Sequence, residues 1–254
     1  MRKPIIAGNW KMNKRLSEAK TFAESLIPLV KTINDCDIII APPFTYLSTL
    51  DDILKSSSIS LSAQTMSHEL AGAFTGDISA VMITDCGCKY VIIGHSEQRH
   101  YHQETNQSCQ KKCKVAMQNK LTPIYCVGES LKERTNNITL TVIEKQILEC
   151  ITDLPLDSQE IIIAYEPVWA IGTGKVATPE EAQAVHQFIR QTLEKSKGAE
   201  IANKTRILYG GSVKPANIEE LINQADIDGA LVGGACLELD SFVELIKKTN
   251  YVTH

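Results

Sequence analysis

The chain has no long apolar run, no excess of positive charge and no cysteine spacing typical of a zinc site. Its 254 residues carry 26 lysines and arginines against 30 aspartates and glutamates, a net charge of −4. This balance argues against a basic surface for nucleic acid or anionic lipid. The N-terminal apolar run is broken at Asn9, which is too early for a secretory signal, and no stretch approaches the roughly 20 apolar residues of a membrane span. We therefore expect a cytoplasmic protein that binds neither nucleic acid nor membrane.

The cysteines form no recognisable metal or disulfide framework. Cys86 with Cys88, and Cys109 with Cys113, are the close pairs among the eight, and neither pair has zinc-ribbon spacing. The histidines within 100–102 are more typical of a helix surface than of a ligand pair. In a long chain without a signal peptide, reduced thiols are the usual state. We expect no metal and no disulfide.

Short apolar runs alternate with amphipathic segments along the chain, without linkers, low-complexity tracts or internal repeats. The runs predict strands over 4–10, 37–43, 59–64, 90–95, 122–127, 160–166, 206–211 and 229–234. Clear helical patterns cover 17–31, 105–119, 138–151 and 179–195. Strict alternation indicates a parallel sheet. Eight such units in about 250 residues favour an α/β fold, a single-domain (β/α)8 barrel over 1–254, rather than an open doubly wound sheet.

The segment AYEPVWAIGTGK, residues 164–175, is the most informative of the chain. It places one carboxylate, Glu166, at a strand end, where Pro167 keeps it out of the helical region. An apolar stretch then occupies a loop that should be polar, and the glycines of 172–174 can absorb large backbone changes. The order of base, apolar flap and hinge predicts a lid over a chemical site. The alternative is an ordinary loop in which Trp169 packs on a neighbour.

The same segment contains a match to the dinucleotide-binding fingerprint GxGxxA at residues 172–177. A true fingerprint forms the tight turn directly after the first strand and opens the next helix. Here it lies several residues beyond the sixth predicted strand, and the following helix has its own capping signal at Thr178, Pro179 and Glu181. We interpret the match as accidental and expect no dinucleotide cofactor.

Polar side chains follow the predicted strands at the end where a barrel carries its chemistry. Asn9 and Lys11 follow the first strand, and alternation places both on one side. His95 and Glu97 follow the fourth strand, and Glu166 ends the sixth. A histidine at a helix start is disfavoured as a cation, so His95 is expected to act as a neutral imidazole. Together these residues predict a site at the barrel mouth.

Glycine pairs end the last two strands, at Gly210-Gly211-Ser212 and Gly233-Gly234, and each precedes a predicted helix. Exposed backbone N–H groups beside a helix start form an anion-binding nest. Loops after the seventh and eighth strands often hold phosphate in barrels of this kind. The two pairs predict a phosphate site.

The chain resembles the triosephosphate isomerase family along nearly its whole length. The segments that carry the resemblance are AGNWKMN (7–13), GAFTGDIS (72–79), YVIIGHSEQR (90–99), PIYCVGE (123–129), AYEPVWAIGTGK (164–175), RILYGGSVKP (206–215) and DGALVGGACL (228–237). They are long, and they occur in the family's order and spacing. The resemblance implies an isomerase of glycolysis and gluconeogenesis that interconverts dihydroxyacetone phosphate and D-glyceraldehyde 3-phosphate.

By this resemblance, five side chains carry the reaction. Glu166 is the base that moves a carbon-bound proton to the adjacent carbon, and His95 donates a hydrogen bond to the enediolate oxygens while remaining neutral. Lys11 and Asn9 stabilise the same negative charge. Glu97 either positions Lys11 or relays a proton, and the sequence leaves both roles open.

The resemblance also implies how phosphate is held. Backbone amides of Gly172, Ser212, Gly233 and Gly234 would bind it, and closure of 167–175 would keep the enediolate from losing phosphate. No metal and no organic cofactor is required.

The family is usually a homodimer in which the loop over 72–76 inserts into the neighbouring subunit, and Thr75 is expected to reach the partner's site. Here Gln98 replaces a usual arginine, Asp77 a usual glutamate and Thr65 a usual asparagine. These changes remove or shorten polar groups near the expected interface. Cys236 replaces a usual serine.

Two other functions remain open from the sequence. A phosphate-binding barrel aldolase would use Lys11 as a Schiff-base amine. A binding or structural protein would keep the fold without catalysis. Proximity of Lys11 to a phosphate favours the protonated amine and so argues against the aldolase, and the full set of site residues argues against the second.

Overall fold

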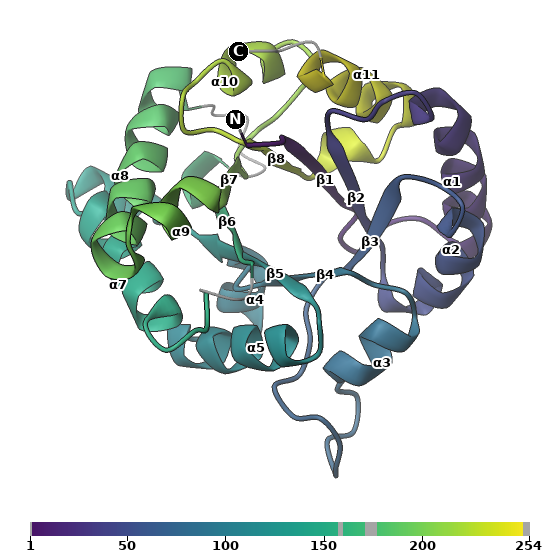
Figure 1. Ribbon diagram of the computed structural model, residues 1–254, viewed down its shortest axis with the longest axis horizontal. Coiled ribbons are helices and arrows are strands. Elements are labelled where there is room, and N and C mark those ends of the chain that lie inside the picture. The colour runs from purple at the N-terminus through teal and green to yellow at the C-terminus, as the bar shows by residue number, and fades with distance from the viewer. Residues whose placement is uncertain (1, 157–159, 171–176, 251–254) are drawn as a thin grey trace.

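Eight parallel strands close into a barrel in the computed structural model, which describes residues 2–156, 160–170 and 177–250 (Figure 1). The strands are β1 (Ile5–Asn9), β2 (Asp37–Ala41), β3 (Ile59–Ala63), β4 (Tyr90–Ile93), β5 (Thr122–Val127), β6 (Ile162–Tyr165), β7 (Arg206–Tyr209) and β8 (Gly229–Val232). They pair in chain order, and β1 pairs with β8 as well as β2, with Ile5 opposite both Gly229 and Asp37. The predicted (β/α)8 barrel is confirmed.

Helices form a ring outside the strands (Figure 1). They are α1 (Leu16–Val30), α2 (Leu47–Leu54), α3 (Ala80–Asp85), α4 (Ser96–Tyr101), α5 (Asn106–Gln118), α6 (Leu131–Thr135), α7 (Thr139–Ile151), α8 (Pro179–Lys197), α9 (Ala199–Lys204), α10 (Ile218–Ile222) and α11 (Leu239–Asn250). Among the described residues, no helix is both long and apolar enough to cross a bilayer.

Alternation along each strand divides the apolar side chains between two cores. The smaller core fills the barrel itself and contains Ile5, Ala7, Ile39, Ala41, Ile92, Ile124, Cys126, Ile162, Ala164, Leu208 and Leu231. The larger core lies between strands and helices, where Ile6, Ile38 and Ile40 point outward against the helix ring. Burial on both faces explains why the strands read as continuous β-branched runs rather than as alternating ones.

The sequence placed every strand but made most of them one or two residues too long. The residues it added at the carboxyl ends, such as 94–95 and 210–211, leave the ladder for the site. Its four helices match α1, α5, α7 and α8 within two residues, and the predicted capping box of Thr178 with Glu181 is present. For α4, α10 and α11 the sequence indicated only that a helix follows His95 and each glycine pair. The short helices α2, α3, α6 and α9 were not predicted, since five to eight residues show little periodicity.

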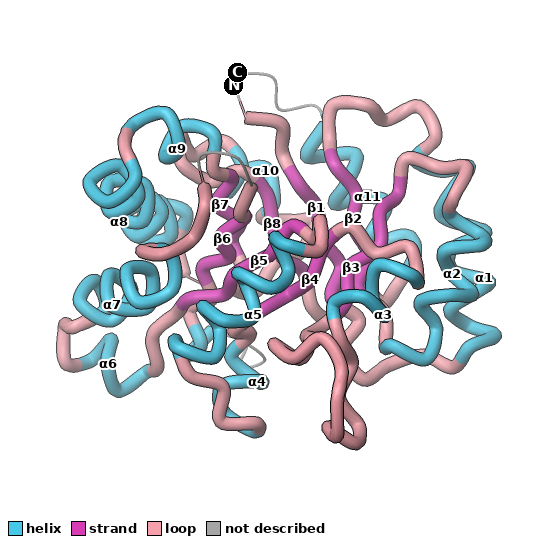
Figure 2. Tube along the Cα trace, turned by 60° about the horizontal axis from the view of Figure 1, so that its bottom comes forward, coloured by secondary structure: helices cyan, strands magenta, loops and turns pink. Residues whose placement is uncertain are grey.

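One long loop departs from the compact outline. The chain between β3 and α3 projects beyond the helix ring as a narrow finger, which is plain in both views (Figures 1 and 2). Residues 71–77 at its tip are exposed, and Gly72 and Gly76 have positive φ angles of 136° and 96°. Phe74 within the tip is 46% exposed.

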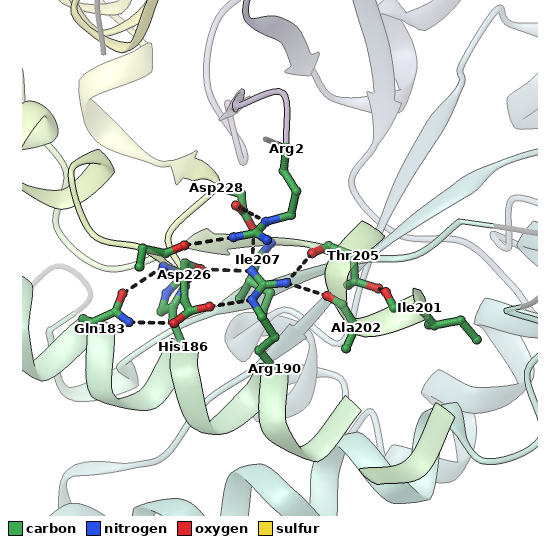
Figure 3. A network of polar contacts seen from close by, with 11 residues as sticks. Arg2, Gln183, His186, Arg190, Ile201, Ala202, Thr205, Ile207, Asp226 and Asp228 are labelled. Atoms are coloured by element: carbon green, nitrogen blue, oxygen red, sulfur yellow. Dashed lines mark hydrogen bonds and ion pairs between the residues drawn. The ribbon is translucent and has the colours of Figure 1, made fainter. Parts of the chain in front are cut away.

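A buried arginine ties the amino-terminal end of the barrel together (Figure 3). Arg190 on α8 donates to Asp226 Oδ1 at 2.6 Å and to Asp228 Oδ2 at 2.8 Å. It also donates to the carbonyl oxygens of Ala202 and Thr205. Removal of this guanidinium would leave Asp226 without its arginine and Asp228 with Arg2 as its remaining arginine, which lies 2.6 Å from Asp228 Oδ1. Breaking a buried pair costs about 3–5 kcal/mol.

A second buried polar group lies beside this network. His186 is fully buried, and its Nδ1 lies 3.1 Å from the carbonyl oxygen of Asp226, so the proton is on Nδ1. Its ring meets those of Tyr165 and Tyr209 at centroid distances of 5.8 and 6.4 Å. Burial lowers the pKa of His186 from 6.5 to about 4. The folded chain therefore holds a neutral imidazole where the unfolded chain takes up a proton.

This difference predicts acid-dependent stability. Because the folded pKa lies below the unfolded one, the stabilisation is complete above pH 6.5 and is lost as the pH falls towards about 4. His186→Asn keeps a donor for Asp226 but does not titrate. We expect the loss of unfolding free energy between pH 7 and pH 5 to be smaller in this variant by about 2 kcal/mol, measured by urea unfolding at one protein concentration. The exposed His100→Asn variant is the control, and an equal pH dependence in all three proteins would contradict the prediction.

Candidate active site

A cavity of about 490 Å³ opens at the carboxyl ends of the strands. It brings together residues that lie far apart in the sequence, all of them predicted: Asn9, Lys11, His95, Glu166, Ser212, Gly233 and Gly234. Glu97 does not line the cavity but contacts Lys11, which does. Gly172 lies outside the described residues. The structure thus brings the described residues of this set together at one end of the barrel.

Glu166 is a buried carboxylate with both oxygens engaged. The residue follows β6 and is 2% exposed. Its Oε1 lies 3.0 Å from His95 Nε2, and its Oε2 accepts from the backbone N–H of Ser96 at 2.9 Å. Hydrogen bonds to the charged form offset the cost of burying a carboxylate. The group is therefore held against β4 until another partner replaces these contacts.

Two glycines make room for Glu166. A Cβ atom at Gly128 would lie 1.8 Å from the carbonyl oxygen of Glu166, and one at Gly210 would lie 2.8 Å from its Cγ. Gly128 follows β5 and Gly210 follows β7, the two neighbours of β6. Larger residues at either position would displace the carboxylate or its backbone.

His95 has a defined tautomer. It is the N-cap of α4, and its Nδ1 accepts from the N–H of Glu97 at 3.2 Å. Since Nδ1 is an acceptor, the proton lies on Nε2, which faces Glu166 and the cavity. The helix start that the sequence indicated thus presents a neutral imidazole with a donor directed into the site.

Lys11 and Glu97 form an ion pair across the mouth of the barrel. Lys11 Nζ lies 2.6 Å from Glu97 Oε1, and the Lys11 N–H donates to Asn9 Oδ1 at 3.1 Å. The second oxygen of Glu97 lies 3.6 Å from His95 Nδ1, too far for a good hydrogen bond. Of the two roles left open for Glu97, the contacts favour positioning Lys11.

The predicted phosphate loops follow β7 and β8, whereas His95 follows β4. A Cβ atom at Gly234 would meet nothing within 4 Å, and one at Gly233 would meet Lys11 Cε at 3.7 Å, so both glycines border open space. The sequence placed a helix directly after each glycine pair. In fact α10 begins only at Ile218, because Lys214 and Asn217 form a turn first, and a short 3-10 helix (Gly234–Cys236) follows Gly233.

The predicted lid begins with an anchored segment, in which Trp169 packs on neighbours as the alternative of an ordinary loop expected. Trp169 Nε1 donates to Glu129 Oε1 at 2.8 Å, and the Tyr165 hydroxyl lies 3.1 Å from Glu129 Oε2. Arg134 lies 4.4 Å from the centre of the Trp169 ring and 3.4 Å from Glu129. Glu129 is fully buried and lies two residues beyond β5, while Glu166 follows β6 directly, and a carboxylate just after a buried strand is the signal that could have identified it. Residues 171–176 of the lid lie outside the described residues.

The thiol of Cys126 is disfavoured as the reactive thiolate. Cys126 on β5 is fully buried, and burial raises its pKa well above the ordinary value for a thiol. Within the described ranges, no three histidine, cysteine, aspartate or glutamate side chains are grouped so that they could hold a metal ion. The exposed positions of His100 and His102 agree with a helix surface.

The sequence profile of triosephosphate isomerase matches residues 4–249 of the chain. The chain belongs to the triosephosphate isomerase family. It is 53% identical to the triosephosphate isomerase of Endomicrobium trichonymphae over 248 residues, which cover 97% of this chain and 99% of that protein. It is similarly 52% identical to the enzyme of Carboxydothermus hydrogenoformans and 50% identical to that of Geotalea uraniireducens, with the same coverage of both chains.

The positions at which this chain departs from the triosephosphate isomerase pattern lie around one groove. A depression of about 390 Å³ is lined by Thr65, Asp77 and Gln98 among others. Asp77 accepts from the Ser67 hydroxyl at 2.6 Å, and Thr65 accepts from Lys112 at 3.3 Å. The shortened side chains thus have partners within the chain. Cys236 is fully buried, and its backbone N–H donates to the carbonyl oxygen of Gly233 at 2.9 Å.

The two buried histidines should show opposite tautomers. We expect His95 to carry its proton on Nε2, because its Nδ1 accepts from the Glu97 N–H. We expect His186 to carry its proton on Nδ1, because this atom faces the carbonyl oxygen of Asp226. Long-range 15N–1H correlation spectra at pH 7 distinguish the two. An Nδ1–H tautomer at His95 would contradict the site geometry, and His186 serves as the internal reference.

Proposed function

We propose that this chain interconverts dihydroxyacetone phosphate and D-glyceraldehyde 3-phosphate through an enediolate. The observation that carries the proposal is a buried carboxylate 3.0 Å from an imidazole Nε2–H, at the head of a cavity bordered by two glycine loops. Membership of the triosephosphate isomerase family supports the same substrate pair. The reaction belongs to glycolysis and gluconeogenesis.

Glu166 is the proposed base. It takes a proton from one carbon of the bound triose and returns it to the neighbouring carbon, so the substrate is isomerised without net change in protonation. To reach the substrate, the carboxylate must exchange its contacts with His95 and Ser96 for contact with carbon-bound hydrogen. The Nε2–H of His95 then becomes free to donate to the enediolate oxygens.

Lys11 and Asn9 are proposed to stabilise the negative charge of the substrate. Lys11 is one of the lysines that line the cavity, and Glu97 Oε1 lies 2.6 Å from its Nζ. Asn9 is 5% exposed and lies between the Lys11 backbone and the cavity. Preorganised groups of this kind act without reorganisation during the reaction.

Phosphate is proposed to bind at the glycine loops through backbone N–H groups of Ser212, Gly233 and Gly234, with Gly172 added when the loop over 167–175 closes. Support comes from the open space over both glycines after β8 and from their proximity to Lys11. The chemistry needs no metal and no organic cofactor, because base and electrophile are both side chains. The Lys11–Glu97 ion pair favours an ammonium over the free amine that an aldolase would need.

A coupled assay of glyceraldehyde 3-phosphate isomerisation with the purified protein tests the activity, and Glu166→Asp tests the base. We expect this variant to fold normally and to lose about 100-fold in kcat, because a shorter side chain withdraws the carboxylate by about 1 Å. Glu194→Asp on the exposed face of α8 is the matched control. Unchanged turnover in Glu166→Asp would refute the assignment.

The protein is also proposed to form a homodimer in which the finger carrying Thr75 enters the groove of a second copy. Support comes from the exposed tip of the finger and from the 390 Å³ groove lined by Gln98 and Thr65. Large apolar side chains near these features are exposed: Met12 by 95%, Tyr101 by 72% and Met82 by 54%. Their burial would supply the apolar area that a stable interface needs.

Thr75→Arg should weaken this dimer, because a charged side chain at the tip would have to be buried in the groove. We expect a shift towards monomer in sedimentation velocity together with a lower kcat. Leu140→Arg, an exposed apolar position on α7, is the control and should change neither property. A native protein that sediments as a fully active monomer would overturn the proposal.

We also place the protein in the cytoplasm. Its eight free cysteines, seven of them buried, suit a reducing compartment.

A further inference from the structure

Lys11 holds an unusual backbone conformation. Its φ angle is +51°, in the left-handed region that residues with a Cβ atom adopt rarely. The residue lies two positions beyond the end of β1 and lines the cavity. Such a conformation persists only where surrounding contacts impose it. The direction in which Lys11 projects therefore depends on the groups that hold its two peptide units.

The amide of Gln64 holds the carbonyl side of Lys11. Gln64 Nε2 donates to the carbonyl oxygen of Lys11 at 2.9 Å and to that of Ala41 at 2.8 Å, so both of its N–H groups are used. Gln64 follows β3 directly, and Ala41 is the last residue of β2. One side-chain amide thus joins the carboxyl ends of β2 and β3 to the chain leaving β1.

The other side of Lys11 is held as well. Asn9 Oδ1 accepts from the Lys11 N–H at 3.1 Å, and the N–H of Trp10 donates to Ala41 O at 3.0 Å. The backbone N–H and carbonyl of Lys11 therefore each have a partner, and both partners are side-chain amides. Asn9 lines the cavity, whereas Gln64 is not among the residues that line it.

We propose that Gln64 is a positioning residue that acts through Lys11. Its two hydrogen bonds hold Lys11 in the left-handed conformation, which aims Nζ at Glu97 and the cavity. Without them, Lys11 relaxes towards negative φ, and its ammonium group leaves the place where it meets the substrate. The inference rests on the proposed function for its kinetic consequence, and on geometry alone for the placement of Nζ.

Gln64→Met is the direct test, because methionine keeps the length and bulk of glutamine and removes both donors. We expect kcat/KM for glyceraldehyde 3-phosphate to fall on the order of tenfold, with KM raised more than kcat is lowered. In a Lys11→Met background the same substitution should cause no further loss, because the group through which it acts is gone. Equal losses in both backgrounds would overturn the proposal.

Gln183→Met is the matched control. Gln183 is also half-buried and also uses its amide within the fold, by donating to Asp226 Oδ2 at 2.7 Å at the opposite end of the barrel. We expect it to lower the melting temperature as much as Gln64→Met does while leaving KM unchanged. A rise in KM in Gln183→Met as large as in Gln64→Met would reduce Gln64 to a structural residue and contradict the proposal.

A spectroscopic readout separates this inference from the proposed activity. The 15Nζ resonance of Lys11, assigned by its loss in Lys11→Met, reports the ion pair with Glu97 in the absence of substrate. Gln64→Met should shift it and Gln183→Met should not. If the native protein had no isomerase activity, the proposed function would be refuted, while the shift would still support the positioning of Lys11 by Gln64. An unchanged resonance in Gln64→Met would refute that positioning role whatever the activity.

Discussion

The pairing of the first strand with the last is the interaction on which the rest of the structure depends. β1 forms a parallel ladder with β2 on one side and with β8 on the other, so the sheet has no edge. Closure sends the carboxyl ends of all eight strands to one rim. It also sets the chain leaving β1 beside the chain leaving β8, where Lys11 Cε comes to the open side of Gly233. An open sheet of the same strands would separate these two groups by its full width.

Closure creates a rim in which buried charge has to be compensated locally. Glu166 and Glu129 lie just beyond adjacent strands and are both nearly inaccessible, and both oxygens of each carboxylate have donors. The donors differ in kind. Glu166 is held by the imidazole of His95 and one backbone N–H, and another partner can replace these two contacts. Glu129 is held by three large side chains, those of Tyr165, Trp169 and Arg134. Two carboxylates one strand apart are thereby given different freedom to move.

Much of the architecture could be predicted from the sequence because it follows from local patterns. β-branched runs, helix caps and glycine pairs are short-range signals, and they placed the eight strands, the capping box at Thr178 and the polar rim. The ends of the strands were less accurate, because Gly210 continues an apolar run but leaves the ladder to make room for Glu166. Hydrophobic periodicity carries no information about such steric contacts.

The contacts that position the site residues could not be predicted in this way. Gln64 and Lys11 lie 53 residues apart, and Trp169 and Glu129 lie 40 apart, so no local pattern connects them. Arg190 and His186 read as ordinary residues of an amphipathic helix, and only the folded chain shows that they are buried against the turn before β8. Side-chain hydrogen bonds between distant segments depend on tertiary placement, which composition and spacing do not specify.

The engaged state of Glu166 has a consequence for selectivity. With both oxygens satisfied in the free protein, the carboxylate is masked, and unmasking it costs two hydrogen bonds. A small carbonyl compound that merely diffuses into the cavity brings too few contacts to offset that cost. A triose carrying a phosphate offers charge to Lys11 and to the glycine loops at the same time. In the function proposed above, the two hydrogen bonds of Glu166 would thus couple its reactivity to the binding of phosphate at the glycine loops.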